Sequence, residues 1–115
     1  MPKKLHPRRV TSRQETQATV EAWRAGALGP LRAAPIRLAA RANAEMAELL
    51  TELSMPEPDL AKAAAEIADV VICLFGVATA LPADLQDQIN RKMAVNRARE
   101  WIPDGTGCGK HKKDP

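Results

Sequence analysis

Apolar residues recur at helical spacing along the central part of the chain. Residues 36–54 contain neither proline nor glycine and are rich in Ala, Leu, Glu and Arg, which predicts a long helix. Its apolar residues lie three or four positions apart and therefore share one face: Ala39, Ala42, Met46, Leu49, Leu50 and Leu53.

Prolines, glycines and capping residues divide the rest of the chain. The predicted helices span residues 16–24, 36–54, 60–81 and 82–101. Asp59 is an expected N-cap, and Pro82 ends one helix and opens the next. Residues 26–35 are predicted as a loop, and the stretch after Pro103 as a flexible glycine-rich tail. Because no strand-like alternation is present, the sequence predicts an all-α helical bundle.

The helix at 60–81 differs from its neighbours. Its second half, Val70–Ala78, reads VVICLFGVA and is apolar on every side, so it is expected to be buried all round. A chain of this size can hardly surround a helix alone, so the pattern predicts a homodimer or homotetramer that completes a four-helix bundle. This apolar run is far shorter than the roughly 20 residues that cross a bilayer, so we expect no membrane association.

Composition narrows the class of protein. The chain has 115 residues, enough for one domain, and only 3% aromatic residues, which argues against an RNA-binding surface built on stacking. The two cysteines and the absence of an apolar leader in the basic N-terminal segment predict a reducing, cytoplasmic location.

Charge is unevenly distributed along the chain. Residues 1–13 hold five bases and no acid, residues 14–89 five bases and eleven acids, and residues 90–115 seven bases and three acids. An acidic middle followed by a basic segment suggests a cation site and an anion site in one small domain.

Four acids carry the candidate chemistry. Glu45 and Glu48 lie three residues apart on one helix, and Glu66 and Asp69 show the same spacing on the next. Two antiparallel helices would bring these pairs face to face, where four carboxylates repel one another unless a divalent cation lies between them. Oxygen ligands suit Mg²⁺, with Mn²⁺ as an alternative.

Other interpretations of these acids compete with a metal site. Glu45 and Glu48 alone fit a solvated helix face, and Glu66 and Asp69 alone fit compensation of the helix dipole. A di-iron bundle needs Glu-x-x-His pairs, whereas His6 and His111 lie in the tails. The joint pattern on adjacent helices favours an oxygen-only metal site.

The sequence resembles the MazG-like nucleotide pyrophosphohydrolases of the all-α NTP pyrophosphatase superfamily. The stretches RANAEMAELL, EIADVVICLFGVA and INRKMAVNRAREWIPDGTGCGKH carry the likeness, and AWRAGALGP resembles a W…FGP lead-in with Leu28 in place of Phe. The likeness covers roughly residues 18–112 and is similar to a phage and bacterial branch that acts on dATP and dGTP. Composition sets a basic flexible tail apart at 1–13 and a glycine-rich, basic tail or flap at 103–115. The MazG-like catalytic domain is expected at 14–102.

The same resemblance implies the reaction NTP + H₂O → NMP + pyrophosphate. Glu45, Glu48, Glu66 and Asp69 would then be the catalytic, metal-binding residues. Bases are also needed for the pyrophosphate leaving group, and Lys92, Asn96 and Arg99 follow helical spacing on one predicted face. An ordinary basic surface is the alternative there, above all for Arg91 and Arg97.

Two further candidates lie near the C-terminus. Trp101 is either a core anchor or a lid on the nucleobase, and Trp23 has the same two interpretations. Lys110 lies in the GTGCGKH stretch, which is not a Walker loop. That stretch is either a loose tail or a flap that closes over the triphosphate.

A different class of function competes with the enzyme. The basic N-terminal arm and the KHKK stretch would suit a helical interaction module that binds nucleic acid. Such a module has no use for Glu66 and Asp69 at the start of an apolar helix, so nucleic acid is the less favoured partner. An inactive family member is a third interpretation.

Overall fold

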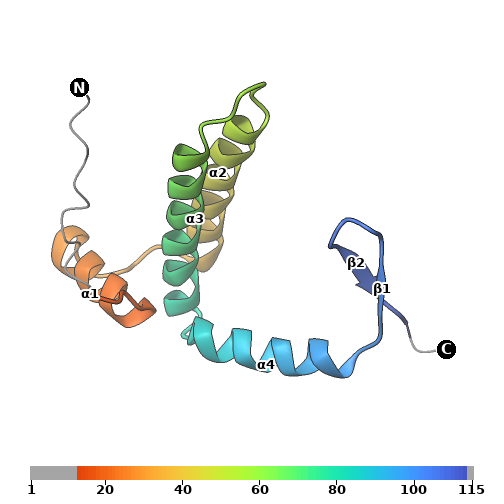
Figure 1. The fold of residues 1–115 in the computed structure, drawn as a ribbon. Coiled ribbons are helices and arrows are strands. Elements are labelled where there is room, and N and C mark those ends of the chain that lie inside the picture. The colour runs from red at the N-terminus through yellow and green to blue at the C-terminus, as the bar shows by residue number, and fades with distance from the viewer. Residues whose placement is uncertain (1–12, 114–115) are drawn as a thin grey trace. The chain divides into compact units, whose positions relative to one another are not determined.

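The computed structural model describes residues 13–113, so the predicted N-terminal tail lies, except for Arg13, outside the described residues. The elements in chain order are α1 (Gln17–Leu28), α2 (Pro35–Leu53), α3 (Leu60–Ala80), α4 (Leu85–Ala98), β1 (Trp101–Pro103) and β2 (Gly109–His111) (Figure 1). The chain divides into two compact units, one ending at Pro82 and the other beginning at Ala83.

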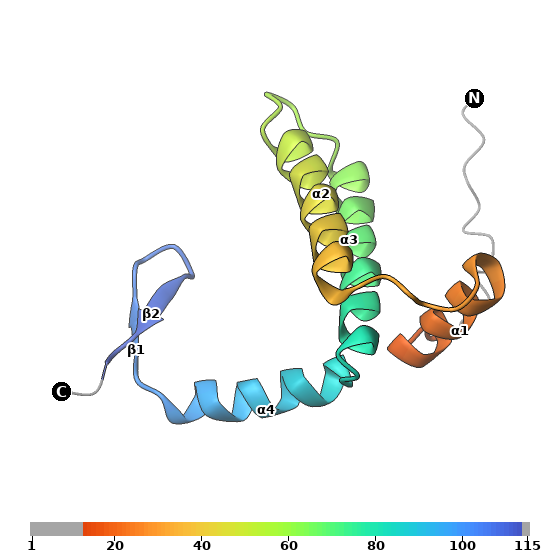
Figure 2. The same cartoon turned by 180° about the vertical axis from the view of Figure 1, so that it is seen from behind.

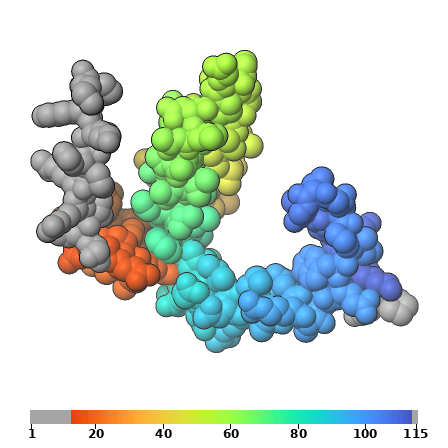
Figure 3. Space-filling model, in the orientation of Figure 1, coloured from red at the N-terminus to blue at the C-terminus, as the bar shows by residue number. Residues whose placement is uncertain are grey.

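An antiparallel pair of helices forms the centre of the first unit. α2 and α3 lie side by side in both views (Figures 1 and 2), and the space-filling view shows them as one continuous body (Figure 3). The buried apolar residues are mostly small, which lets the two backbones approach closely: Ala42, Leu49, Ala63, Val70 and Ala78.

The connection between α2 and α3 is fixed by two carboxylates. Asp59 caps α3 by accepting a hydrogen bond from the Lys62 backbone N–H at 3.1 Å, as the sequence predicts. Glu52, near the end of α2, accepts a hydrogen bond from the Asp59 backbone N–H at 2.9 Å. The end of one helix is thereby tied to the start of the next, and this sets the register of the acids on the two helices.

The apolar half of α3 is less covered than its sequence predicts. Of residues 70–78, only Val70, Gly76 and Ala78 are buried, while Val71 and Leu74 are each more than a third exposed. The expectation of burial on every side is therefore wrong for the single chain, which places one helix, α2, along this one and α1 beside it.

The length and hydropathy of α3 also pass a test for membrane-spanning helices. Among the described residues it is the one helix long and apolar enough to cross a bilayer, with a mean hydropathy of 1.9 over its most apolar window. Core helices of soluble proteins pass the same test, and α3 carries Lys62, Glu66 and Asp69, so this property by itself is weak evidence for a membrane.

The first helix is longer than predicted. α1 begins at a capping box formed by Thr16 and Thr19 and continues through Gly26 to Leu28, four residues beyond the predicted end. Gly29 then adopts a φ of 82°, which favours glycine and ends the helix. Glycine inside a helix costs stability without breaking it, which explains why Gly26 does not end α1.

The second unit departs most from the sequence prediction. Asp84 caps α4, which ends at Ala98 rather than near Trp101. Trp101 instead begins β1, which pairs with β2 in an antiparallel hairpin with Trp101 opposite His111. The predicted flexible tail is therefore a hairpin between residues 101 and 111. The fold is nevertheless all-α in class, because the helices hold most of the described residues.

Candidate metal centre and substrate cavity

Three of the four predicted acids come together between α2 and α3. Glu45, Glu48 and Glu66 each offer a carboxylate oxygen, and these oxygens all lie within 4.8 Å of one another. The helical spacing explains the arrangement, because residues three apart share a face and the two helices are antiparallel. The structure thus brings together acids from two helices, as the sequence predicts.

The cluster is electrostatically unfavourable without a cation. Burial raises the pKa of Glu45 above its ordinary value, and the negative charges of Glu48 and Asp69 raise it further. Burial also raises the pKa of Glu66, followed by repulsion from Glu48, Asp69 and Glu45. Raised carboxyl pKa values mark a place where negative charge is crowded and partly removed from water.

A buried oxygen of Glu66 lacks a partner among the described residues. Its Oε2 atom is inaccessible to solvent and makes no hydrogen bond to any of them. Buried polar atoms are rarely left in that state, and a carboxylate oxygen in this position is a suitable ligand for a hard divalent cation. The donor set of the cluster, which consists of carboxylate oxygens only, fits Mg²⁺ or Mn²⁺.

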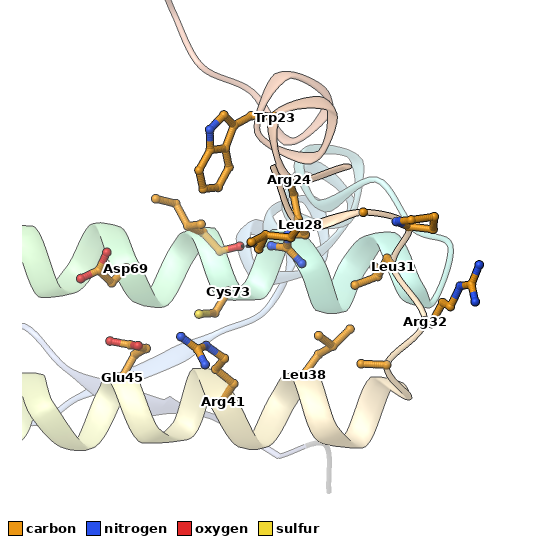
Figure 4. A pocket seen from close by; sticks show the side chains of 14 residues that line it. Trp23, Arg24, Leu28, Leu31, Arg32, Leu38, Arg41, Glu45, Asp69 and Cys73 are labelled. Carbon is orange, nitrogen blue, oxygen red and sulfur yellow. Dashed lines mark hydrogen bonds between the residues drawn. The ribbon is translucent and has the colours of Figure 1, made fainter. Parts of the chain in front are cut away.

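Asp69 lies at the edge of this arrangement. It does not belong to the group of oxygens within 4.8 Å, although its charge acts on both Glu45 and Glu66. Figure 4 shows Asp69 on α3 and Glu45 on α2, on opposite sides of a cavity that both residues line.

That cavity has a volume of about 720 Å³ and is mainly apolar. Its walls come from α1, from the loop that follows, and from the facing sides of α2 and α3 (Figure 4). Trp23 and Leu28 line it together with Leu31, Leu38 and Ile72. Trp23 therefore lies at a cavity wall and not in a buried core, and its predicted contact with a nucleobase stays a prediction.

Cys73 and Arg41 also line this cavity (Figure 4). Burial raises the pKa of the Cys73 thiol, and the charge of Glu45 raises it further. A thiol with a raised pKa stays protonated and is a poor nucleophile. Cys73 is half-buried at a wall of the cavity.

A second, smaller cavity of about 480 Å³ lies on the other side of the cluster. Glu48 and Glu66 line it together with Thr51, Glu52 and Lys62. The ammonium group of Lys62 is 3.5 Å from Glu52 and its charge lowers the pKa of Glu66. The acid cluster is therefore bordered by a large, mainly apolar cavity and by a smaller one whose lining is polar and apolar in equal parts.

The second unit gathers only some of the predicted substrate residues. Asn96, Arg99 and Trp101 line a cavity of about 630 Å³, together with Arg97. Lys92 and Lys110 do not line it. Arg99 follows the end of α4 with extended backbone, so the predicted helical face of Lys92, Asn96 and Arg99 is wrong with respect to Arg99.

Trp101 takes a position that the sequence did not predict. Its indole N–H donates a hydrogen bond to the Asn96 carbonyl at 2.7 Å, and its ring meets His111 edge to face at a centroid distance of 5.9 Å. The side chain remains 46% exposed, so it is not a buried core anchor within the described residues.

Several residues of these cavities were missed in the sequence. The sequence favours an ordinary surface for Arg97, which lines the cavity of the second unit, and indicates no role for Arg24, which lines the apolar cavity. It indicates none for Gly76 either, which lies against the Arg24 side chain. A glycine inside an apolar helix is a known sign of close packing, so Gly76 offered a signal. The sequence around Arg24 gives no such signal, because Ile72 and Gly76, which it contacts, lie about 50 residues further along the chain.

Taken together, the fold and the acid cluster define an all-α protein with a carboxylate site for divalent cations beside an apolar cavity. No family model matches the chain. A dATP/dGTP diphosphohydrolase from cyanophage S-2L is 36% identical over 98 residues, which cover 84% of this chain and 85% of that protein. The chain belongs to the MazG-like pyrophosphohydrolase family.

A solved structure supports the same assignment. The cyanophage S-2L MazG-like pyrophosphohydrolase, bound to dGDP and three catalytic Mn²⁺ ions per active site, aligns with a TM-score of 0.64 at 31% identity. The alignment covers 86% of this chain and 91% of that one. The expected family and the all-α fold are thereby confirmed.

Proposed function

We propose that this protein hydrolyses deoxynucleoside triphosphates to the monophosphate and pyrophosphate with the help of Mg²⁺ or Mn²⁺. The observation that carries the proposal is the group of three carboxylates within 4.8 Å, one of which has a buried oxygen without a partner. Membership of a family whose cyanophage relative is a dATP/dGTP diphosphohydrolase makes dATP and dGTP the first substrates to test.

Glu45, Glu48 and Glu66 would hold the cations, with Asp69 as a further ligand at the edge of the site. Bound there, divalent cations supply charge that stabilises phosphate oxygens and lowers the pKa of water. The chain itself contributes carboxylates held in place by two packed helices and partly shielded from water, which strengthens their attraction for cations.

The apolar cavity is suited to the nucleoside. It begins at Glu45 and Asp69, where the phosphates would meet the cations, and continues along Trp23, Leu38 and Ile72. A nucleobase is a flat, largely apolar group that gains from contact with such walls. Chain geometry therefore orients the substrate with its base away from the acids.

Two arginines of the second unit are proposed to bind phosphate groups. Arg97 and Arg99 line one cavity with Asn96 and Trp101, and guanidinium groups are well suited to phosphate oxygens. Lys92 lies on α4 outside this cavity and stays a predicted phosphate contact. Lys110 lies on β2, in the hairpin that follows α4 along the chain. We propose it as a mobile phosphate contact, in line with the role that the sequence suggests.

The direct test is turnover of each of the four deoxynucleoside triphosphates with Mg²⁺ or Mn²⁺, followed by product analysis. Pyrophosphate and the monophosphate are expected in equal amounts. Release of orthophosphate, or no turnover under any condition, would mean a different reaction or an inactive family member.

A second copy of the chain is the proposed protein partner. α3 exposes Ile67, Val71 and Leu74, which recur at helical spacing on one face, and a stripe of this kind packs well in a helical bundle. The alternative of a nucleic-acid-binding module is less well supported, since it gives no use to the crowded acids.

A further inference from the structure

The first helix contributes to the apolar cavity without being held by a core of its own. No residue of α1 is buried, and Trp23, which lines the cavity, is 63% exposed. A side chain with so little packing is placed by the position of its helix rather than by its own contacts. What fixes α1 on α3 therefore also fixes Trp23.

Two polar contacts set the register of α1 on α3. The Gln17 side-chain amide donates a hydrogen bond to the Thr79 hydroxyl at 3.0 Å, and Arg24 Nη2 donates one to the Ile72 carbonyl at 3.3 Å. The two contacts are seven residues, or about two helical turns, apart on each helix. The residue numbers rise along α1 and fall along α3, and the spacing is roughly 10 Å on both helices.

The Arg24 contact depends on a glycine. A Cβ atom at position 76 would lie 2.8 Å from both Cζ and Nη2 of Arg24 and closer still to Nη1. The backbone of Gly76 does not have a positive φ, so glycine is needed there for space and not for conformation. The guanidinium of Arg24 therefore occupies a notch in α3.

The notch holds the Arg24 side chain firmly. Only 14% of that side chain is exposed, and Nη2 also lies 3.0 Å from a carboxylate oxygen of Glu21, one turn earlier on α1. The ion pair offsets the charge of a guanidinium that is largely removed from water. The planar group is thus fixed by an acid from its own helix and a carbonyl from the next.

We propose that Arg24 and Gly76 form a lock that positions Trp23 on the wall of the substrate cavity, so that Arg24 is a positioning residue for nucleoside binding. This inference rests on the proposed function, because the cavity is taken to hold the nucleoside. Because the lock acts through geometry, removing the guanidinium and removing the space for it should have the same effect.

The test compares Arg24→Ala with Gly76→Ala. The second variant keeps the arginine charge and adds a methyl group that displaces the guanidinium, and alanine favours the helix, so the variant should fold. Arg37→Ala removes an equivalent charge from an exposed position outside the cavity. Gly26→Ala adds the same methyl group inside α1, where nothing lies within 4 Å.

Two readouts are needed. The first is the ¹⁹F NMR spectrum of protein labelled with 5-fluorotryptophan, in which Trp23→Phe assigns the Trp23 resonance. Both lock variants should shift that resonance in the absence of nucleotide, and both controls should leave it unchanged. The second is steady-state kinetics with dGTP, where both lock variants should raise KM about tenfold with kcat changed by less than about twofold.

Each outcome decides the proposal. A raised KM in Arg24→Ala with normal KM and an unchanged Trp23 resonance in Gly76→Ala would overturn it and assign the arginine charge to direct substrate contact. An unmoved resonance in both lock variants would also overturn it. If wild-type protein hydrolyses no nucleotide, the proposed function fails, while the ¹⁹F shift still decides whether the lock positions Trp23.

Discussion

Glu66 is the residue at which the acid cluster has its clearest effect on stability. Its pKa is raised by burial and then by three neighbouring carboxylates, and its Oε2 atom has no hydrogen-bond partner among the described residues. A raised folded-state pKa means that ionisation of this carboxyl opposes folding of the metal-free protein as the pH rises above the ordinary value of 4.5.

Replacing Glu66 by Gln should have opposite effects on turnover and stability. Turnover should fall at least about a hundredfold, because a ligand of the cations is lost. The Tm in EDTA should rise, because one of several like charges is removed. Calorimetry in EDTA and in Mn²⁺ measures both states, with the exposed Glu57→Gln as the charge-matched control. A lower Tm than wild type in EDTA would contradict the crowded-carboxylate interpretation.

Arg99 and Lys92 allow the proposed phosphate-binding role of the second unit to be tested residue by residue. Arg99 lines the cavity of the second unit and Lys92 does not, so Arg99→Ala should lower kcat/KM about tenfold or more while Lys92→Ala has a smaller effect. Affinity for Mn²⁺ should be unchanged in both variants. If Lys92→Ala lowers kcat/KM more than Arg99→Ala does, the phosphate contact lies on the helical face of Lys92 that the sequence predicts.

Asp104 gives the hairpin a dependence on pH. Hydrogen bonds from the Thr106 hydroxyl at 2.6 Å and the Thr106 backbone N–H at 2.8 Å hold the pKa of Asp104 below its ordinary value. Because the folded pKa is lowered, the carboxylate stabilises the turn above the ordinary pKa of 3.8, and this contribution is lost as the pH falls through the folded value.

Thr106→Val should therefore move the loss of the hairpin to higher pH, since it removes the hydroxyl that does most to lower the Asp104 pKa. The indole N–H signal of Trp101 follows the transition in an NMR titration between about pH 2 and pH 5. Identical titration curves for wild type and Thr106→Val would show that this hydrogen bond does not set the stability of the turn.

At the scale of helices, Glu52 has a structural role on α2, whereas the neighbouring acids Glu45 and Glu48 belong to the candidate metal site. Glu45, Glu48 and Glu52 lie three and then four residues apart on α2, yet Glu52 is only 9% exposed and accepts a hydrogen bond from the Asp59 backbone N–H. It is not among the three acids of the cluster. Its place in the fold is the joint between α2 and α3.

Glu52→Ala should lower the free energy of unfolding by about 2 kcal/mol, because the Asp59 N–H loses its acceptor. Glu52→Gln keeps an acceptor oxygen and should lose much less. Urea denaturation measures both variants, and a Mn²⁺ titration should find wild-type affinity in each. Loss of metal affinity in Glu52→Gln would place this residue in the cation site instead.

The elements also show which features the sequence can predict. The acids of α2 and α3 were predicted because local periodicity and one short connection are enough to place them. The end of α4 was not, because residues 101–103 pair with residues 109–111, and pairing between strands overrides local helix propensity. Gly76 could not be understood from its own helix, because its partner Arg24 lies on α1.

At the scale of the whole molecule, the exposed stripe of α3 is the feature that a single chain leaves unexplained. Ile67 is 52% exposed and Leu74 is 39% exposed, although both lie on the most apolar helix of the described residues. A small domain gains much of its stability from buried apolar area, so a second copy packed on this stripe would complete the core around α2 and α3.

Leu74→Glu should therefore lower the oligomeric state measured by sedimentation or by light scattering after size exclusion. A negative charge in an apolar interface has no partner and loses its hydration. Ile36→Glu is the control, since Ile36 is 78% exposed and lies in the first turn of α2, not on the exposed stripe of α3. If Leu74→Glu has the same oligomeric mass as the wild type, the interface does not lie on this stripe of α3. If the wild type is itself a monomer, the stripe is covered by something other than a second copy.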